Sequence, residues 1–243
     1  MRPLQLARPR DIGQLFGDAL SVYGRNLGIF LLLAAAIAVP VELIVGGIGL
    51  EQLSSSYDES PPVAESAIAT AVSFLVVAPL ITATTIHALR RAAAGERLAP
   101  AQSLVEGLEA FTPIFAAILL AALGIALGLL ALIVPGVYLA VRWYFVPQAV
   151  VLDRARGPAA LARSGQVVQG KWWRTLGVVV LANLAVALPG LLILAPFTAI
   201  ASSTDRELWS LVGQTAAEVV TTPFVALVST LLWYDLQARG SGR

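Results

Sequence analysis

The chain has 243 residues, of which 58% are hydrophobic and 13% are charged, and its formal net charge is +1. Soluble proteins are about half apolar and about a quarter charged, so this chain has too little polar surface for a water-soluble particle. The near-neutral charge gives no reason to expect a nucleic-acid partner. Because the sequence contains no Cys, disulfides and thiol-ligated metals are excluded.

Six apolar segments are long enough to cross a membrane. We predict that they are helices, since backbone groups in lipid must be hydrogen-bonded within their own segment. The predicted spans are 27–50, 67–89, 112–134, 136–152, 175–200 and 214–235. The fourth is the shortest and contains Arg142 and Pro147. The sequence therefore predicts an all-α, polytopic transmembrane helical bundle of about six spans, forming a single domain over 1–243.

The basic residues are concentrated on one side of this arrangement. Fourteen of the 16 Lys and Arg residues lie before the first span, after the second, after the fourth or in the C-terminal tail. The loops on the opposite side are acidic instead. By the positive-inside rule, the basic side faces the cytoplasm. We therefore predict a multi-pass protein of the bacterial cytoplasmic (inner) membrane with both termini in the cytoplasm.

A short amphipathic segment precedes each outward-going span. Their apolar residues recur at helical spacing, which predicts interfacial helices on the cytoplasmic side. These segments are 11–24, 101–111 and 158–172. Each begins a unit of interfacial helix, outward span, loop and return span, which suggests three weak parallel repeats. The predicted repeats are 11–95, 100–157 and 158–243.

The third amphipathic segment leads into the sequence Gly-Lys-Trp-Trp-Arg. Trp favours the headgroup level of a membrane, and Lys and Arg there can face lipid phosphates. Residues 165–171 also resemble the start of a phosphate-binding loop, but Trp172 replaces the required Ser or Thr and the context is helical. We therefore predict an interfacial lipid contact, whose residues are Lys171, Trp172, Trp173 and Arg174.

Three ionisable residues, Glu42, Arg142 and Glu218, lie within the predicted spans. Such groups are costly in lipid and are candidates for function. At about 1.5 Å per residue, all three lie in the outer third of the membrane. We therefore expect Arg142 to pair with one or both acids. A structural salt bridge, a substrate or proton site, and snorkelling of Glu218 to the interface are the alternatives.

Several stretches resemble a known family. They are Arg10-Asp11-Ile12-Gly13, Gly17-Asp18-Ala19, residues 134–143, Pro147 and Gly170-Lys171-Trp172-Trp173. Together they are similar to the membrane domain of some bacterial glycerophosphoryl diester phosphodiesterases, and the resemblance covers nearly the whole chain. In that family the phosphodiesterase chemistry belongs to a separate soluble barrel domain with paired His residues. This chain has one His, so the resemblance implies a stand-alone membrane domain without that activity.

These observations favour a non-catalytic membrane protein that binds lipid or scaffolds a partner. No nucleophile–base pair is recognisable, so we expect neither catalytic residues nor a metal or other cofactor. The expected partners are membrane lipids and other membrane proteins. The alternative is a small transporter or channel that uses the charged cluster, which would require an open cavity reaching Glu42, Arg142 and Glu218.

Overall fold

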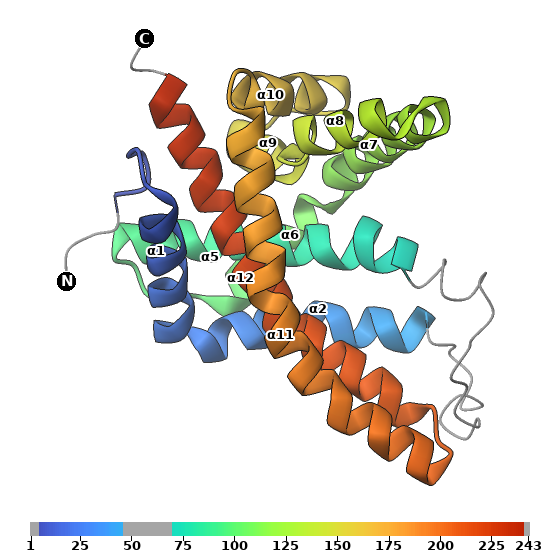
Figure 1. The fold of residues 1–243 in the computed structure, drawn as a ribbon. Coiled ribbons are helices and arrows are strands. Elements are labelled where there is room, and N and C mark those ends of the chain that lie inside the picture. The colour runs from blue at the N-terminus through green and yellow to red at the C-terminus, as the bar shows by residue number, and fades with distance from the viewer. Residues whose placement is uncertain (1–4, 46–69, 241–243) are drawn as a thin grey trace.

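A computed structural model describes residues 5–45 and 70–240, and all regular secondary structure in these ranges is helical (Figure 1). The all-α prediction is therefore confirmed for this part of the chain. In chain order the elements are α1 (Ile12–Arg25), α2 (Leu27–Val45), the π-helical turn η1 (Ser73–Val77), α5 (Ala78–Ala94), α6 (Pro100–Glu109), α7 (Phe111–Ala131), α8 (Ile133–Arg142), α9 (Val146–Asp153), α10 (Pro158–Val168), α11 (Trp172–Thr204) and α12 (Leu208–Gly240).

Five helical segments among the described residues are long and apolar enough to cross a membrane. They are Leu27–Ile44, Thr70–Ala94, Phe111–Ala131, Trp172–Thr204 and Leu208–Gly240. They correspond to five of the six predicted spans, although 46–69, where the first predicted span ends and the second begins, lies outside the described residues. Length and composition therefore agree with a polytopic membrane protein.

The prediction of one continuous span over 136–152 is wrong. This segment forms α8 and α9, which are separated by a turn at residues 143–145 and are each too short to cross a membrane. Pro147 lies in the first turn of α9, where its missing N–H costs no helical hydrogen bond. α8 folds back along α7, and a Cβ on Gly128 would lie only 3.0 Å from Cα of Gly136. Close glycine contact thus makes a helical hairpin instead of a separate span.

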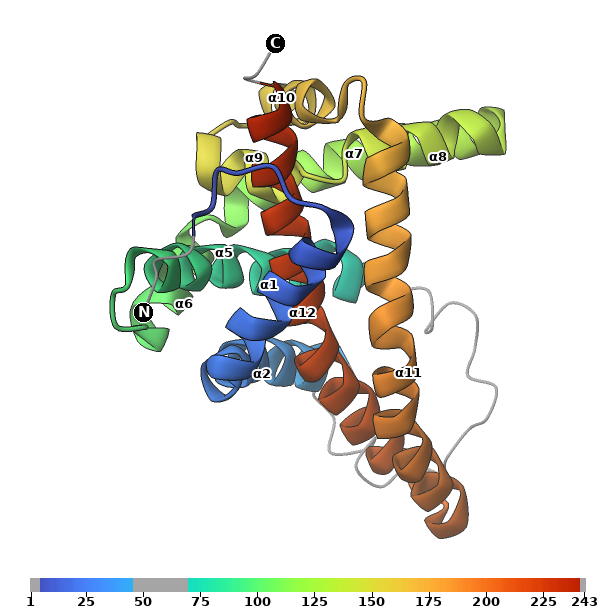
Figure 2. The ribbon, with the colours of Figure 1, turned by 60° about the vertical axis from the view of Figure 1, so that its left-hand side comes forward.

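α12 is the central helix of the structure. It packs against α1, α2, α5 and α11, and its Trp233 is fully buried against Phe145, with the ring centroids 5.7 Å apart. α11 and α12 run side by side as a long hairpin (Figures 1 and 2). α11 has 33 residues, hence a length of about 50 Å, which exceeds the thickness of a hydrocarbon core. Only 11% of its most apolar window is buried, so most of its surface is free to contact lipid.

The three amphipathic segments occur as the separate helices α1, α6 and α10. α1 begins with a capping box, in which Gln14 N–H donates to the side chain of Asp11 and the Gln14 side chain accepts from the Asp11 amide. α10 ends at Val168, earlier than predicted, so Trp172 and Trp173 belong to the first turn of α11. The orientation of these helices in the membrane plane and the threefold repetition stay predictions.

Candidate functional site

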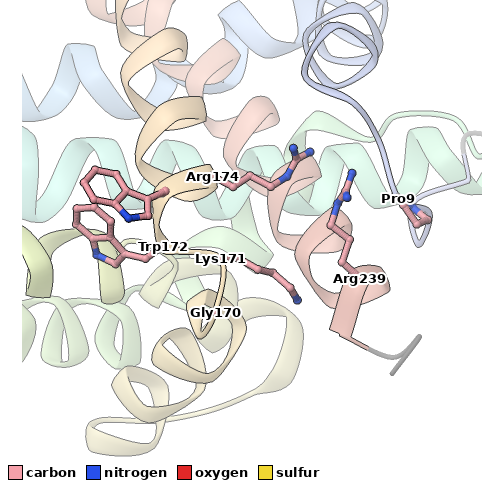
Figure 3. Close-up of a pocket in the computed structure, with 7 residues that line it drawn as sticks. Pro9, Gly170, Lys171, Trp172, Arg174 and Arg239 are labelled. Atoms are coloured by element: carbon pink, nitrogen blue, oxygen red, sulfur yellow. The ribbon is translucent and has the colours of Figure 1, made fainter.

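A pocket of about 680 Å³ lies where α11 begins, beside the end of α12 and the segment that precedes α1 (Figure 3). We call it the basic pocket; its lining residues are Pro9, Gly170, Lys171, Trp172, Trp173, Arg174 and Arg239. All four residues of the predicted lipid contact are among them. The structure thus brings the predicted group together in one concave site.

The turn between α10 and α11 explains how consecutive residues line one pocket. Gly170 has φ of 73°, a left-handed conformation that glycine adopts without the steric cost that a side chain brings. This turn places Lys171 at the N-cap of α11, and Trp172, Trp173 and Arg174 follow in its first turn. The partial positive charge of a helix N-terminus adds to the basic side chains.

The side chain of Asp235 pairs with both arginines of the pocket, Arg174 and Arg239. This side chain is fully buried, and Nε of Arg174 and Nε of Arg239 donate to its two oxygens over 3.0 Å and 2.9 Å. The backbone N–H of Arg10 donates a third hydrogen bond of 2.7 Å to the same carboxylate. Charge-assisted hydrogen bonds of this kind are strong where water is excluded, so Asp235 fixes the positions of both guanidinium groups.

The same arginines hold the N-terminal segment at its backbone. Nη2 of Arg174 and Nη2 of Arg239 donate to the carbonyl oxygen of Arg10 over 2.7 Å and 2.6 Å. Pro9, directly before Arg10, forms part of the pocket wall. The wall therefore depends on the N-terminal segment being docked against α11 and α12.

The side chain of Arg10 points away from the pocket and is 1% exposed. Its Nε donates to Asp18 over 2.9 Å, and its other nitrogens donate to backbone carbonyls of residues 5–8. Burial raises the pKa of the Asp18 carboxyl, but hydrogen bonds from Arg10 and Arg8 outweigh burial and hold that pKa below its ordinary value of 3.8. Asp18 thus stays ionised and neutralises the buried Arg10.

Lys171 is tied to the end of α12. Its Nζ donates to the carbonyl oxygen of Leu236 over 2.6 Å. The pocket lining therefore contains three cationic side chains, those of Lys171, Arg174 and Arg239, and the two arginines pair with the buried Asp235. A cluster of cationic side chains favours an anion in the pocket.

An aromatic wall closes another side of the pocket. Trp172 stacks on Tyr138 of α8 with centroids 6.1 Å apart, and its Nε1 donates to the Tyr138 carbonyl over 3.2 Å. Trp173 contacts Trp172 edge-on and is 78% exposed. Arg142 supports the far side of Tyr138, since its Nη1 donates to the Tyr138 hydroxyl over 3.1 Å. Tryptophans with one apolar face exposed are typical of a membrane interface.

The prediction that Arg142 pairs with Glu42 or Glu218 is wrong, since no ion pair joins these residues within the part of the chain that the structure describes. Because α8 turns back along α7, Arg142 meets α10 instead. A Cβ on Gly165 would lie 2.9 Å from Nε of Arg142. The backbone carbonyl of Arg142 accepts a 2.8 Å hydrogen bond from the Ser164 hydroxyl. Counting residues along a straight span could not foresee this return.

Glu42 and Glu218 lie on α2 and α12, which pack against each other, and the two acids are within electrostatic range. The hydroxyl of Ser73 in η1 donates a 2.6 Å hydrogen bond to Oε1 of Glu218. Of the predicted charged cluster, the two acids thus lie on neighbouring helices, whereas Arg142 donates a hydrogen bond to Tyr138 instead.

A family model described as a domain of unknown function, DUF7847, matches residues 103–234, more than half of the chain. The chain belongs to this family. None of the curated proteins compared with it and no solved structure matches. The DUF7847 match contains Tyr138 and the run from Gly170 to Arg174, whereas Pro9 and Arg239 lie outside it.

Sequence reasoning found the part of the pocket that is contiguous in the chain and missed Arg239 and Pro9. Arg239 was counted only as one of the basic residues of the tail, and Pro9 carries no charge or periodicity that marks it. The buried Asp235 was the available signal. Asp235 lies four residues before Arg239 in an apolar helix, where an unpaired carboxylate is costly, so a basic partner for it could be expected.

Proposed function

We propose that this chain is an integral membrane domain that binds the phosphate-bearing headgroup of a lipid in the basic pocket and catalyses no reaction on it. The bacterial cytoplasmic membrane, with both termini in the cytoplasm, is the proposed location. Five apolar helices and the partition of basic residues support this placement. The resemblance to a glycerophosphoryl diester phosphodiesterase membrane domain stays a prediction.

One observation carries the proposal: three cationic side chains and two tryptophans line one pocket at the start of a membrane-length helix. Lys and Arg donate to phosphate oxygens, and Trp side chains lie at the level where headgroups meet acyl chains. Scaffolding of other membrane proteins, the other half of the sequence-based prediction, has support only from the exposed apolar surface of α11, which lipid would cover equally well.

The test is lipid retention by the purified full-length protein. Lys171→Gln removes one charge but keeps a donor for the Leu236 carbonyl. Arg97→Gln removes one charge from the same basic side at an exposed position outside the pocket. Mass spectrometry of co-purified lipids should show less anionic phospholipid on Lys171→Gln and an unchanged amount on Arg97→Gln. Equal retention by both variants and the unchanged protein contradicts the proposal.

A second candidate function is transport of a proton or small cation past Glu42 and Glu218. Two acids on membrane-length helices that pack against each other favour it, since ionisable groups at such positions commonly line ion pathways. Glu218→Gln keeps the hydrogen bond from Ser73 possible while removing the charge. In proteoliposomes, a proton or cation flux that this substitution abolishes would support transport, and no flux above that of empty liposomes excludes it.

A further inference from the structure

We infer that α11 associates with α11 of a second copy of this chain through the exposed face that contains Asn183. This inference goes beyond the proposed function and does not depend on the basic pocket. Three features of α11 support it: an outward-facing amide at mid-membrane depth, the donor and acceptor that this amide has left, and the side chains around it.

Asn183 lies on the outer face of a membrane-length helix. α11 packs along α12 and contacts α8, and the side chain of Asn183 stays exposed beside them. At about 1.5 Å per residue, Asn183 is about 16 Å from the start of α11, or about half the depth of a hydrocarbon core of about 30 Å. Water is absent at this depth, so an amide that faces lipid is costly. A polar partner is therefore favoured at Asn183.

The hydrogen bonding of Asn183 leaves one donor and one acceptor. Nδ2 donates to the carbonyl of Val179, one turn earlier in the same helix, over 2.8 Å. This bond uses one of the two N–H groups of the amide, and Oδ1 accepts no hydrogen bond from a described residue. Two such amides satisfy each other, because each donates its second N–H to the oxygen of the other. Hydrogen bonds of this kind between Asn side chains associate membrane helices.

A second copy presents the complementary amide at the required depth. Two copies inserted in the same orientation have equal residues at equal depth, and a twofold axis along the membrane normal brings each residue to its own counterpart. Asn183 of one copy therefore meets Asn183 of the other where their α11 helices cross. A different membrane protein would need an amide at the same depth, and the hydrocarbon core of a bilayer offers neither donor nor acceptor. The self-complementary amide thus favours a second copy.

The side chains around Asn183 suit close packing of two helices. The row of α11 that continues from Asn183 at a spacing of four residues is exposed and contains small side chains: Ala187, Leu191 and Ala195. The neighbouring row is bulkier, with exposed fractions of 46–68%: Val180, Leu184, Leu188 and Leu192. Rows with this spacing form the ridges and grooves that interdigitate between helices, and small residues let the backbones approach. Lipid covers the leucines as well as protein does, but it leaves the amide between them unsatisfied.

The experiment measures self-association of the purified full-length protein in phosphatidylcholine vesicles. Copies labelled at the C-terminus with a donor or an acceptor fluorophore report dimers by energy transfer over a range of protein-to-lipid ratios. Asn183→Leu removes the amide at similar volume and should raise the dissociation constant about tenfold, as two interhelical hydrogen bonds allow. Ser202→Ala is the control, since Ser202 is also exposed and donates to its own helix but lies near the end of α11. It should leave the dissociation constant unchanged.

A second pair of variants tests which face of α11 is involved. Ala187→Leu fills the row of small residues and should weaken the dimer. Ala185→Leu adds the same bulk at an exposed position on another side of the helix and should not. Because these positions are exposed, each variant should keep the Tm of the unchanged protein, which thermal unfolding verifies.

Four outcomes would overturn the inference. Energy transfer no greater than that of randomly distributed monomers, at every ratio, rejects a second copy. A dimer that Asn183→Leu leaves unchanged rejects the amide contact, and equal weakening by Ala187→Leu and Ala185→Leu rejects this face. A monomer in vesicles whose Ala187→Cys variant crosslinks to another protein in native membranes assigns the face to a different partner.

Discussion

The backbone N–H of Arg10 donates a 2.7 Å hydrogen bond to the carboxylate of Asp235, which joins the segment before the first helix to the last helix. The carbonyl of the same residue accepts from Arg174 and Arg239, the two cations that Asp235 holds. The docked N-terminal segment therefore shares its contacts with the side chains that line the basic pocket. Both ends of the described chain consequently lie at the same end of the molecule.

The first prediction concerns Asp235→Asn. The change removes the negative charge that pairs with two arginines and replaces one of the two acceptor oxygens by an NH2 group, which faces a donor. Removing one partner of a buried ion pair lowers the free energy of unfolding by about 3–5 kcal/mol. Because Arg174 and Arg239 are partly exposed, we expect a decrease near the lower limit of this range. Thermal unfolding in detergent should show a marked decrease in Tm. Trypsin should also cleave after Arg10, whose side chain is buried in the unchanged protein.

Asp153→Asn is the matched control for this change. Asp153 pairs with Arg163 over 2.5 Å, but both side chains are about one-third exposed. Exposed pairs contribute about 0–1 kcal/mol, so this variant should unfold almost as the unchanged protein does and should resist cleavage after Arg10. Similar losses in the two variants would contradict the central role of Asp235.

The second prediction is an acid transition at the N-terminal segment. The pKa of Asp18 is below 3.8, its ordinary value, so its contribution to stability is present above that pH and is lost as pH falls through the lowered pKa. Asp18→Asn lacks this contribution at every pH. The Tm of the unchanged protein should therefore exceed that of the variant at pH 6 and approach it as pH falls below about 4. A constant difference down to pH 3 would show that Asp18 does not stabilise the docked segment as a carboxylate.

Helices could be predicted wherever an apolar run or a helical periodicity lies within one segment of the chain. Features that depend on contacts between distant segments could not be predicted. α7 and α11 follow directly from their apolar runs. The break between α8 and α9 does not, because Gly136 makes its decisive contact with Gly128 on another helix. Arg142 was misplaced for the same reason. The sequence predicted only the contiguous part of the pocket lining, since Arg239 and Pro9 reach the pocket through tertiary packing.

The third prediction tests the packing of α5 against α6. A Cβ on Gly107 would lie 2.3 Å from Cγ2 of Thr84 and 3.2 Å from the Thr84 backbone nitrogen. Gly107→Ala should therefore destabilise the protein by about 1–3 kcal/mol, despite the better helix propensity of Ala. Thr84→Ser removes the clashing methyl and keeps the hydroxyl that donates to the Ile81 carbonyl. The double variant should regain much of the lost Tm.

Gly17→Ala provides the control for backbone propensity. No atom lies within 4 Å of a Cβ built on Gly17, which is in the exposed face of α1. This variant should be as stable as the unchanged protein or more stable, by up to about 1 kcal/mol. If Gly107→Ala behaves like Gly17→Ala, the close approach of α5 and α6 is not a determinant of stability.

The last prediction concerns the path of the chain between α6 and α10. The protein has no Cys, so single substitutions at the exposed positions Arg97, Arg154 and Ser203 report sidedness with a membrane-impermeant thiol reagent. α7 is long enough to cross the membrane, whereas α8 and α9 are not when taken singly. If the two short helices together return the chain, positions 97 and 154 lie on one side. Position 203, at the far end of α11, then lies on the other.

This arrangement follows from the contacts at the pocket. Tyr138 of α8 stacks on Trp172, and Lys171 hydrogen-bonds the end of α12, so the return hairpin and the final helix reach the same region as the docked N-terminal segment. We expect reagent added to right-side-out vesicles to label position 203 and to reach 97 and 154 only after permeabilisation. Labelling of 154 without permeabilisation while 97 stays protected would mean that α8 and α9 remain at the outer surface. In that case five crossings would place the ends of the chain on opposite sides, against the hydrogen bond between Arg10 and Asp235.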